Sequence, residues 1–228
     1  MPGTGIKAHY VHLHGESLVK PFGSRAQLVE QIHQCQALLT HSGAPIKKLG
    51  DGDIPQELAP TDTYIYSARD RSLAVTFTRA VGYSKIDCGL IETENQSSVI
   101  TTPAGHCNIN HRNKTAVGAC DNNAVSIAPH QTRPPEAQSL GGKQIAGHHC
   151  DVFGVAAPIK AFTCLSRDGD FPAFPSKINP AFLPGLPLSV DTAFTKAEAI
   201  EVKMAMDVSP KLFAAPPGYK LISSPVGK

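Results

Sequence analysis

Two histidines in the N-terminal stretch AHYVHLHG have a spacing that suits metal binding. Alternate side chains of an extended strand share a face, so His12 and His14 project together beside Tyr10, while His9 points to the other face. Imidazole nitrogens are ligands of Cu²⁺, Ni²⁺ and Zn²⁺. We therefore predict His12 and His14 as a candidate copper or zinc site. The alternative is an exposed polar face at the end of a strand.

Cysteine chemistry gives a second set of candidates, because the chain has six cysteines and no CxxC pair. An even, dispersed set is more typical of disulfides than of zinc sites. The stretches QIAGHHCDVFGV and IKAFTCLS are predicted to be two strands around AAP. A loop centred on Ala157 would place Cys150 opposite Cys164, at a distance that a disulfide bridges. The alternatives are a metal site that uses His148 with Cys150, and free buried thiols.

The same argument applies to HCNINHRNKTAVGAC. A two-residue turn at Asn113 and Lys114 would place Cys107 opposite Cys120 in a hairpin. Cys35 and Cys88 remain as a pair between a helix and a strand. Because four cysteines allow three connectivities, other pairings of these four stay open.

The cysteines also bear on the compartment, since structural disulfides persist in oxidising environments. The chain opens MPGTGIKAHY, which lacks the apolar region of a secretory leader. Either a leader is absent from this numbering, or the cysteines are free thiols in a cytosolic protein. We favour the first and expect a periplasmic or extracellular protein.

The composition argues against several classes of function. Charged residues make up 18% of the 228-residue chain and the net charge is +2, which does not favour nucleic acid as a partner. No apolar run approaches the length of a membrane span. The GxSxG, P-loop, HExxH and dinucleotide-binding patterns do not occur. We therefore predict a protein that is not an enzyme, with no catalytic residues and with no cofactor other than a possible Cu or Zn ion.

The pattern of apolar residues predicts a single domain, 1–228, of the β-dominated α+β class. Short alternating segments predict antiparallel strands, and SRAQLVEQIHQCQALLTHSG predicts one amphipathic helix at about 24–42 with Ser24 as N-cap. PHQTRPPEAQSLGGK and AFPSKINPAFLPGLP are predicted to be proline-rich connectors. The expected architecture is a curved antiparallel sheet or half-open barrel.

The last third of the chain resembles secreted bacterial proteins of the LolA-like superfamily, in a poorly characterised branch. The resemblance covers about 80 residues and consists of three ordered segments, KQIAGHHCDVFGV, GLPLSVDTAF and DVSPKLFAAPPGYKLI. The matching positions are Gly147, Cys150, Phe153, Gly185, Pro187, Leu188, Phe213, Pro217, Gly218 and Tyr219. It implies an extracytoplasmic curved sheet partly plugged by a helix. The lipoprotein carriers of the superfamily bind acyl chains on the concave face, but no carrier arginine can be placed here.

The strand AIEVKMAMDV would supply the apolar side of such a sheet, with Ile200, Val202, Met204, Met206 and Val208 on one face. We expect the helix stripe of Leu28, Val29, Ile32, Leu38 and Leu39 to lie against Val202, Met204, Met206 or their neighbours. The segment 171–187 is expected to plug the remainder with Phe174 and Phe182. These five residues, Val202, Met204, Met206, Phe174 and Phe182, are the candidate ligand-binding set.

Three functions are consistent with these features. The first is an extracytoplasmic, non-enzymatic protein whose curved sheet binds an apolar small molecule or a protein partner. The second is a periplasmic metal-handling protein that uses surface histidines to bind Cu or Zn. The third is an accessory or structural subunit of a cell-surface assembly. A continuous apolar pocket would favour a small ligand, and its absence would favour a protein partner.

Overall fold

A computed structural model describes residues 5–19, 23–102, 105–120, 137–155, 161–166, 168 and 185–222. The elements are strands with one α-helix and two short 3₁₀ segments among the described residues. In chain order they are β1 Ile6–Ser17, α1 Arg25–His41, η1 Asp51–Asp53, β2 Pro60–Ala68, β3 Ser72–Tyr83, β4 Leu90–Thr102, β5 Gly105–Asn110, β6 Thr115–Gly118, β7 Ala137–Ile145, β8 His148–Val155, β9 Ala161–Ser166, β10 Leu186–Asp191, β11 Thr195–Val208, η2 Pro210–Phe213 and β12 Lys220–Ile222.

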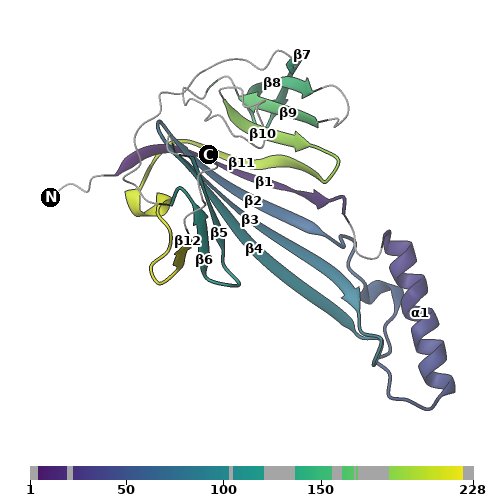
Figure 1. The fold of residues 1–228 in the computed structure, drawn as a ribbon. Coiled ribbons are helices and arrows are strands. Elements are labelled where there is room, and N and C mark those ends of the chain that lie inside the picture. Colours follow the sequence, from purple (N-terminus) through teal and green to yellow (C-terminus); the bar gives the residue numbers. More distant parts are fainter. Residues whose placement is uncertain are drawn as a thin grey trace.

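The strands form one twelve-stranded sheet in the order β12-β6-β5-β4-β3-β2-β1-β11-β10-β9-β8-β7. Every neighbouring pair is antiparallel except β12 with β6. The strands β7 to β10 curve away from the long strands β1 to β4, and the sheet does not close on itself (Figure 1). The predicted β-dominated α+β class with a curved antiparallel sheet is therefore confirmed.

β1 lies at the centre of the sheet between β2, the next strand in the chain, and β11 near the C-terminal end of the described chain. The backbones of β1 and β11 approach closely at Gly15. A Cβ atom at this position would lie 2.0 Å from the carbonyl oxygen of Lys196 and 2.6 Å from the Cβ of Ala197. Only glycine fits there, so Gly15 allows the N-terminal strand to pair with β11 along its whole length.

Strands β1 to β4 pair with one another without irregularities, which divides their side chains between two faces. On β1, Tyr10, His12 and His14 share one face, as predicted, and Val11 and Leu13 share the other. Registers without bulges extend the first set across β2 and β3. We call this side the aromatic face and define it by Tyr10, His12, His14, Asp62, Tyr64, Tyr66 and Phe77.

Two apolar clusters lie at opposite ends of the aromatic face, as the order of residues along β3 shows. Leu73 and Val75 belong to a cluster closed by Phe213 of η2, which is 1% exposed. Val81, farther along β3, belongs to a second cluster with α1. Phe77, between them, belongs to neither. A third cluster lies on the opposite side of the sheet from the aromatic face. It joins Val11 and Leu13 to the curved strands β7 to β10.

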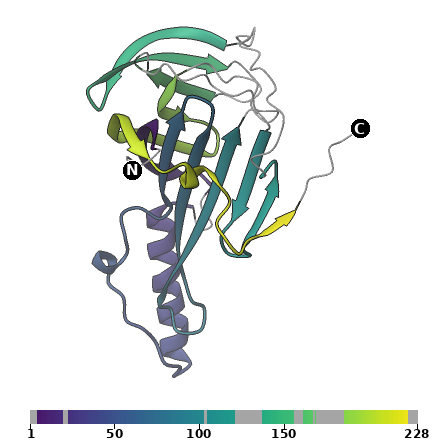
Figure 2. The ribbon, with the colours of Figure 1, turned by 90° about the vertical axis from the view of Figure 1, so that its left-hand side faces the viewer.

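The helix forms where it was predicted, but it packs in a different place. Ser24 accepts a hydrogen bond from the backbone nitrogen of Gln27 and the Gln27 side chain accepts one from Ser24, which completes a capping box. Leu28 and Ile32 pack on Ile54 and on Val81 of β3. The helix lies beside the far ends of the long strands (Figure 2).

The predicted contact of the helix with Val202, Met204 and Met206 is therefore wrong. These residues pack in the two clusters that do not include α1. Leu38, predicted to lie on the buried stripe, is 72% exposed. The physical reason is that the loop after the helix brings its own apolar residues, Ile54 and Leu58, which cover the short stripe of the helix locally.

The predicted common face of AIEVKMAMDV is also wrong, because β11 contains two irregularities against β1. The first lies at Ile200, where Leu13 pairs with Ala199 and His12 pairs with Glu201. Ile200 is consequently 61% exposed. The second lies at Ala205, which has a φ of 51°. Each extra residue moves the residues that follow it in β11 to the other face of the sheet. The apolar residues that were predicted to share one face are therefore divided between both faces.

The three disulfides join the pairs that the sequence analysis favoured: Cys35–Cys88, Cys107–Cys120 and Cys150–Cys164. The expected direct opposition within the two hairpins is wrong, however. Cys164 pairs with Val152 in the β8–β9 ladder, and Cys107 pairs with Gly118 in the β5–β6 ladder. Each hairpin disulfide is therefore diagonal, with Cα atoms 5.4 Å apart for Cys150–Cys164 and 4.7 Å apart for Cys107–Cys120.

β4 begins at Leu90, and its polar first half pairs with β3 over the full length of that strand. Two predicted segments differ from the structure. Residues 137–143 of the predicted connector lie in β7. The predicted single strand QIAGHHCDVFGV is instead the end of β7, a turn at Ala146 and Gly147, and β8. The rest of this connector and residues 171–184 lie outside the described residues.

Candidate functional site

The candidate site lies in the middle of the aromatic face, where two histidines meet one carboxylate. Nε2 of His12 lies 2.7 Å from Oδ1 of Asp62, and Nδ1 of His14 lies 2.9 Å from the same oxygen. The other ring nitrogen of His14 lies 3.7 Å from a carboxylate oxygen of Glu57. Since a carboxylate only accepts, both imidazoles donate to Asp62. The side chains are 17% exposed for His12, 36% for His14 and 34% for Asp62.

Strand pairing explains this arrangement. β2 pairs with β1 so that Asp62 lies opposite His14 and Tyr64 lies opposite His12. His12 and His14 are two residues apart on one face of β1, so the Asp62 carboxylate can contact both imidazoles. Sequence reasoning identified His12 and His14 but missed Asp62. The only available signal was that TDTYIYS carries its single acidic residue on the same alternating face as Tyr64 and Tyr66.

These contacts shift the pKa values of His14 and Asp62. The hydrogen bond to Asp62 raises the pKa of His14 above its usual value, against an opposing effect of burial, and the charges of Asp62 and Glu57 act in the same direction. Burial alone would raise the pKa of Asp62, but the hydrogen bonds from His14 and His12 outweigh it and hold this pKa below its usual value. At mildly acidic pH the cluster is therefore a charged pair of His14 with Asp62.

The structure places His12 and His14 together, but their nitrogens are directed at a carboxylate oxygen. Within the described ranges, no group of three or more His, Cys, Asp or Glu side chains is arranged to hold a metal ion. The alternative site at His148 and Cys150 does not form, because the Cys150 sulfur is bonded to Cys164. His148 lies 3.4 Å from Asp168 instead.

A row of aromatic rings continues from the histidines across three strands. The ring of His12 stacks on Tyr64 at a centroid distance of 4.4 Å, and Phe77 meets Tyr64 edge-on at 5.8 Å. Tyr10 lies 5.2 Å from Tyr66 in the next cross-strand pair of the same face. These rings are half-buried or, for Tyr10, buried. Tilted and edge-on contacts of this kind fix the rings in place.

Tyr10 connects this row to β11. Burial is the main cause that raises the pKa of the Tyr10 hydroxyl to about 12, and the neighbouring carboxylate of Glu201 adds to it. Lys203 lies 5.4 Å from the centre of the Tyr10 ring and 2.7 Å from Glu201. The aromatic row is thus bordered along β11 by one cation and one anion.

The predicted apolar ligand site is not brought together as one set. Val202 and Met204 are half-buried and pack against the cluster between β1 and the curved strands, whereas Met206 packs on the cluster of Phe213. Phe174 and Phe182 lie outside the described residues. The described residues therefore place three of the five candidates in two separate clusters on opposite faces of the sheet.

A chain of hydrogen bonds joins β4 to the C-terminal segment at the end of the sheet that holds the Phe213 cluster. Oγ of Ser98 lies 2.7 Å from Nε2 of His111, and Nδ1 of His111 lies 2.9 Å from the hydroxyl of Tyr219. Ser98 is only 4% exposed. The Ser98 hydroxyl is therefore shielded from solvent, and the chain of contacts joins β4 to the C-terminal segment that carries β12.

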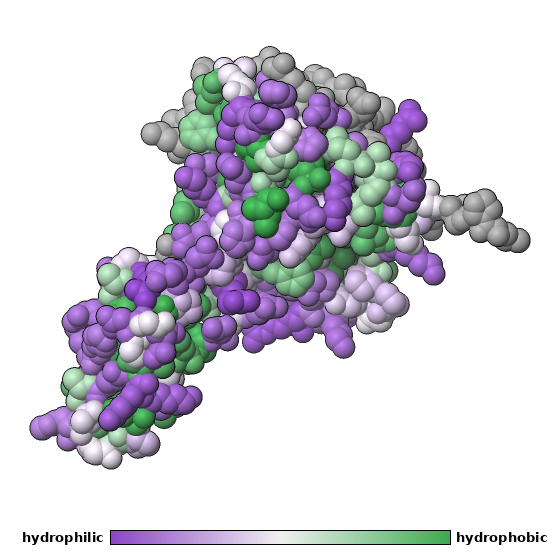
Figure 3. Space-filling view, turned by 180° about the vertical axis from the view of Figure 1, so that it is seen from behind, coloured by the Kyte–Doolittle hydropathy of each residue, from purple (hydrophilic) through white to green (hydrophobic). Residues whose placement is uncertain are grey.

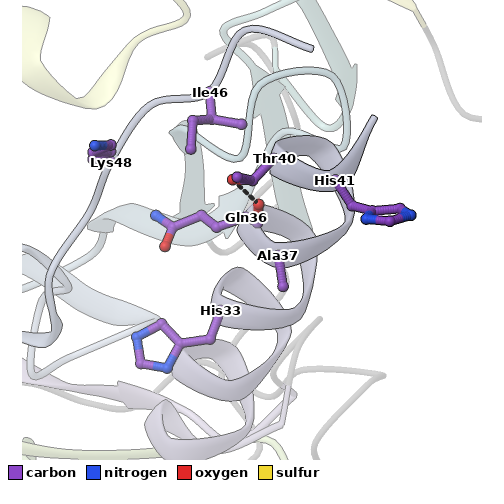
Figure 4. A pocket seen from close by; sticks show the side chains of 7 residues that line it. All are labelled: His33, Gln36, Ala37, Thr40, His41, Ile46 and Lys48. Atoms are coloured by element: carbon purple, nitrogen blue, oxygen red, sulfur yellow. Dashed lines mark hydrogen bonds between the residues drawn. The ribbon is translucent and has the colours of Figure 1, made fainter. Parts of the chain in front are cut away.

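Two hollows in the described surface are open to solvent. The larger, of about 600 Å³, lies between α1 and the segment after it, and is lined by His33, Gln36, Ala37, Thr40, His41, Ile46 and Lys48 (Figure 4). Gln36 donates to the carbonyl oxygens of Lys47 and Leu49, and the His41 ring points away from the other labelled side chains. The smaller, of about 330 Å³, lies beside Cys150 between β7 and β8. Both are open, whereas a site that binds an acyl chain encloses most of its ligand.

Exposed hydrophobic residues of the described chain occur in small groups. On the side seen in Figure 3, hydrophilic residues cover most of the area and hydrophobic residues lie between them. Phe194 and Val19 form one such group at the end of β1, where the backbone of Leu18 bonds to that of Phe194.

Among the described residues, no helix combines the length and apolar character needed to cross a membrane.

Comparisons with known proteins give no family. No family model matches the chain, and no curated protein matches it. A crystal structure of an uncharacterised conserved protein from Thermus thermophilus is similar at a TM-score of 0.41 and 6% identity, over 95% of this chain and 90% of that one. The resemblance of the last third to LolA-like proteins therefore stays a prediction.

Proposed function

We propose that this protein is a non-enzymatic binding protein of an extracytoplasmic compartment, and that it binds a protein partner on the aromatic face. Three disulfides among the described residues suit an oxidising compartment outside the cytoplasm. The observation that carries the proposal is the fixed row of His12, Tyr64 and Phe77, which lies between two apolar clusters and belongs to neither.

The chemistry of this row resembles that of protein interfaces more than that of a lipid site. Tyrosine and phenylalanine are enriched in the centres of interfaces, where they provide contact area at a low entropic cost. The charged groups Asp62, Glu201 and Lys203 surround the rings, as in the polar rim of an interface. An apolar small molecule would need an enclosed cavity, and the two hollows of the described surface are open.

Site-specific photocrosslinking tests this proposal. A benzophenone amino acid replaces Phe77 in the full chain, expressed in its natural host. The matched variant carries the same group at Thr78, the next residue of β3, whose side chain lies on the opposite face. We expect one discrete protein adduct from position 77 and none from position 78.

Two outcomes would contradict the proposal. Adducts of the same proteins from both positions would indicate non-specific contact. An adduct at position 77 with the mass of a lipid or another small molecule would identify an apolar ligand, which is the other occupant expected from the sequence.

Metal handling is a second candidate, favoured by the convergence of His12 and His14 on one oxygen of Asp62. Equilibrium dialysis against Cu²⁺ or Zn²⁺ tests it. A site of one ion per chain that is lost in the His12→Ala/His14→Ala variant would support it. An unchanged site in that variant, or no bound ion in either protein, would exclude these histidines as ligands.

A further inference from the structure

The side of the long strands opposite the aromatic face has an unusual composition, because it carries no charged residue from β2 to β6. Strands β2 to β6 contain four charged residues, Asp62, Arg79, Glu92 and Glu94. The registers place all four on the aromatic face: Asp62 opposite Phe77, Arg79 opposite Glu94, and Glu92 opposite Val81. A solvent-facing sheet surface usually carries charges, and 18% of this chain is charged.

Hydroxyl and amide side chains occupy most of these positions, and apolar residues occupy others: Ile65, Ala74, Ala80, Ile91, Val99 and Val117. Cross-strand pairing arranges the hydroxyl and amide side chains in rows, such as Thr76–Ser97–Asn110–Thr115 and Thr78–Asn95. We call this side the hydroxyl face and define it by Thr76, Thr78, Thr93, Asn95, Ser97, Asn108, Asn110 and Thr115. Five of the eight, Thr93, Asn95, Ser97, Asn108 and Asn110, are exposed and the other three are half-buried.

The hydroxyl face is a regular grid of groups that both donate and accept hydrogen bonds. Neighbouring strands lie about 4.8 Å apart, and alternate residues of one strand lie about 6.7 Å apart. Serine and threonine hydroxyls and asparagine amides each offer a donor and an acceptor. Threonine is stiff at χ1, and the bond of 3.1 Å between the hydroxyls of Thr63 and Thr76 fixes the inner part of the grid. Little side-chain entropy is therefore lost when a ligand binds.

The chemistry of the hydroxyl face selects a class of ligand. A face without charge offers no attraction to nucleic acid, phosphate or an acidic polymer. It also lacks the aromatic, methionine and arginine side chains that anchor protein partners, and the basic residues that anchor membranes. A neutral polyhydroxylated chain fits, because its hydroxyl groups need donors and acceptors at many positions and no counter-charge.

We propose that the hydroxyl face of β3, β4 and β5 binds neutral polysaccharide. Each sugar unit makes weak contacts here, since no ring stacks on it, and binding to a polymer gains strength from many units that are equivalent. This site lies on the opposite side of the sheet from the aromatic face and does not depend on a protein partner.

Affinity electrophoresis of the full chain, with its disulfides intact, tests this site. The protein is run in native gels that contain dextran, hydroxyethyl cellulose or the acidic polysaccharide alginate. We expect at least one of the two neutral polymers to slow the protein and alginate not to slow it. Asn95→Ala/Asn110→Ala and Ser97→Asp should each raise the apparent dissociation constant at least fivefold, because they remove amides from the grid or place a charge in it.

Gln96→Ala is the matched control, since Gln96 lies between Asn95 and Ser97 in β4 but on the aromatic face. It should leave the retardation unchanged, and an unchanged thermal midpoint should show that each variant is folded. The proposal is overturned if neither neutral polymer slows the protein, if alginate slows it equally, or if Gln96→Ala weakens binding as much as the variants of the hydroxyl face do.

Discussion

Met204 and Met206 are two residues apart in β11 but point to opposite faces of the sheet. Val202 pairs with Val11 and Lys203 pairs with Tyr10, whereas Met206 pairs with Ala8. The additional residue of β11 is Ala205, whose backbone nitrogen donates to Nδ1 of His9 at 3.1 Å. Met204 therefore packs with the curved strands, and Met206 packs in the cluster of Phe213.

Double-mutant cycles should reveal this separation. Met206→Ala and Phe213→Leu change residues of one cluster, so their effects on the free energy of unfolding should deviate from additivity by about 0.5 kcal/mol or more. Met204→Ala with Phe213→Leu should be additive to within about 0.5 kcal/mol, because the two sites share no cluster. Denaturant unfolding of the single and double variants measures both values. Equal coupling of the two methionines to Phe213 would contradict the assignment.

The sequence was informative wherever a local pattern also determines the structure. The alternation of Tyr10, His12 and His14, the cap at Ser24 and the fold class follow from short-range rules. The even cysteine set also indicated disulfides.

Long-range pairing produced the features that the sequence did not reveal. Asp62 meets His12 and His14 only because β2 lies beside β1 in one particular register. The irregularities at Ile200 and Ala205 arise from the pairing of the two ends of the chain, which no local period encodes. For the same reason, the docking of α1 was predicted wrongly, and the uncharged face of β2 to β6 was not predicted.

The β7–β8 turn offers a position where stability should increase. Ile145 pairs with His148, which leaves a two-residue loop of Ala146 and Gly147 with φ values of 49° and 82°. Positive φ at both positions is typical of a type I′ turn, in which asparagine is favoured at the first position. Ala146→Asn should raise the free energy of unfolding by about 0.5–1 kcal/mol, as measured by denaturant unfolding. Gly147→Ala should lower it, and a loss of stability in Ala146→Asn would argue against this turn.

The Cys150–Cys164 disulfide should contribute strongly to stability. It joins β8 and β9 and both sulfur-bearing residues are buried in one cluster with Ile145 and Leu188. Removal of a disulfide that closes a loop of this size should cost about 3 kcal/mol, so Cys150→Ala/Cys164→Ala should lower the free energy of unfolding by about that amount. Peptide mapping without reduction should recover the two cysteines in one linked peptide. Free thiols at both positions would contradict the pairing.

The His14–Asp62 pair should make stability depend on pH in a defined window. The pKa of His14 is raised in the folded state, so its contribution is complete below the ordinary histidine value of about 6.5 and is lost as the pH rises through the raised pKa. The pKa of Asp62 is lowered, so its contribution is complete above about 3.9 and is lost as the pH falls through the lowered pKa. Between these limits both contributions are present.

Asp62→Asn should therefore destabilise the protein more at about pH 5.5 than at about pH 9, where His14 is neutral. Since the side chains of His14 and Asp62 are 36% and 34% exposed, solvent screening should limit the difference to about 1 kcal/mol or less. Glu57→Gln is the control, because Glu57 lies 3.7 Å from His14 and is more exposed, and it should show a smaller dependence. Denaturant unfolding at both pH values measures the free energies, and an NMR titration of His14 should show that its pKa falls in Asp62→Asn. An equal loss of stability at the two pH values, together with an unchanged His14 titration, would mean that the two side chains are not coupled in solution.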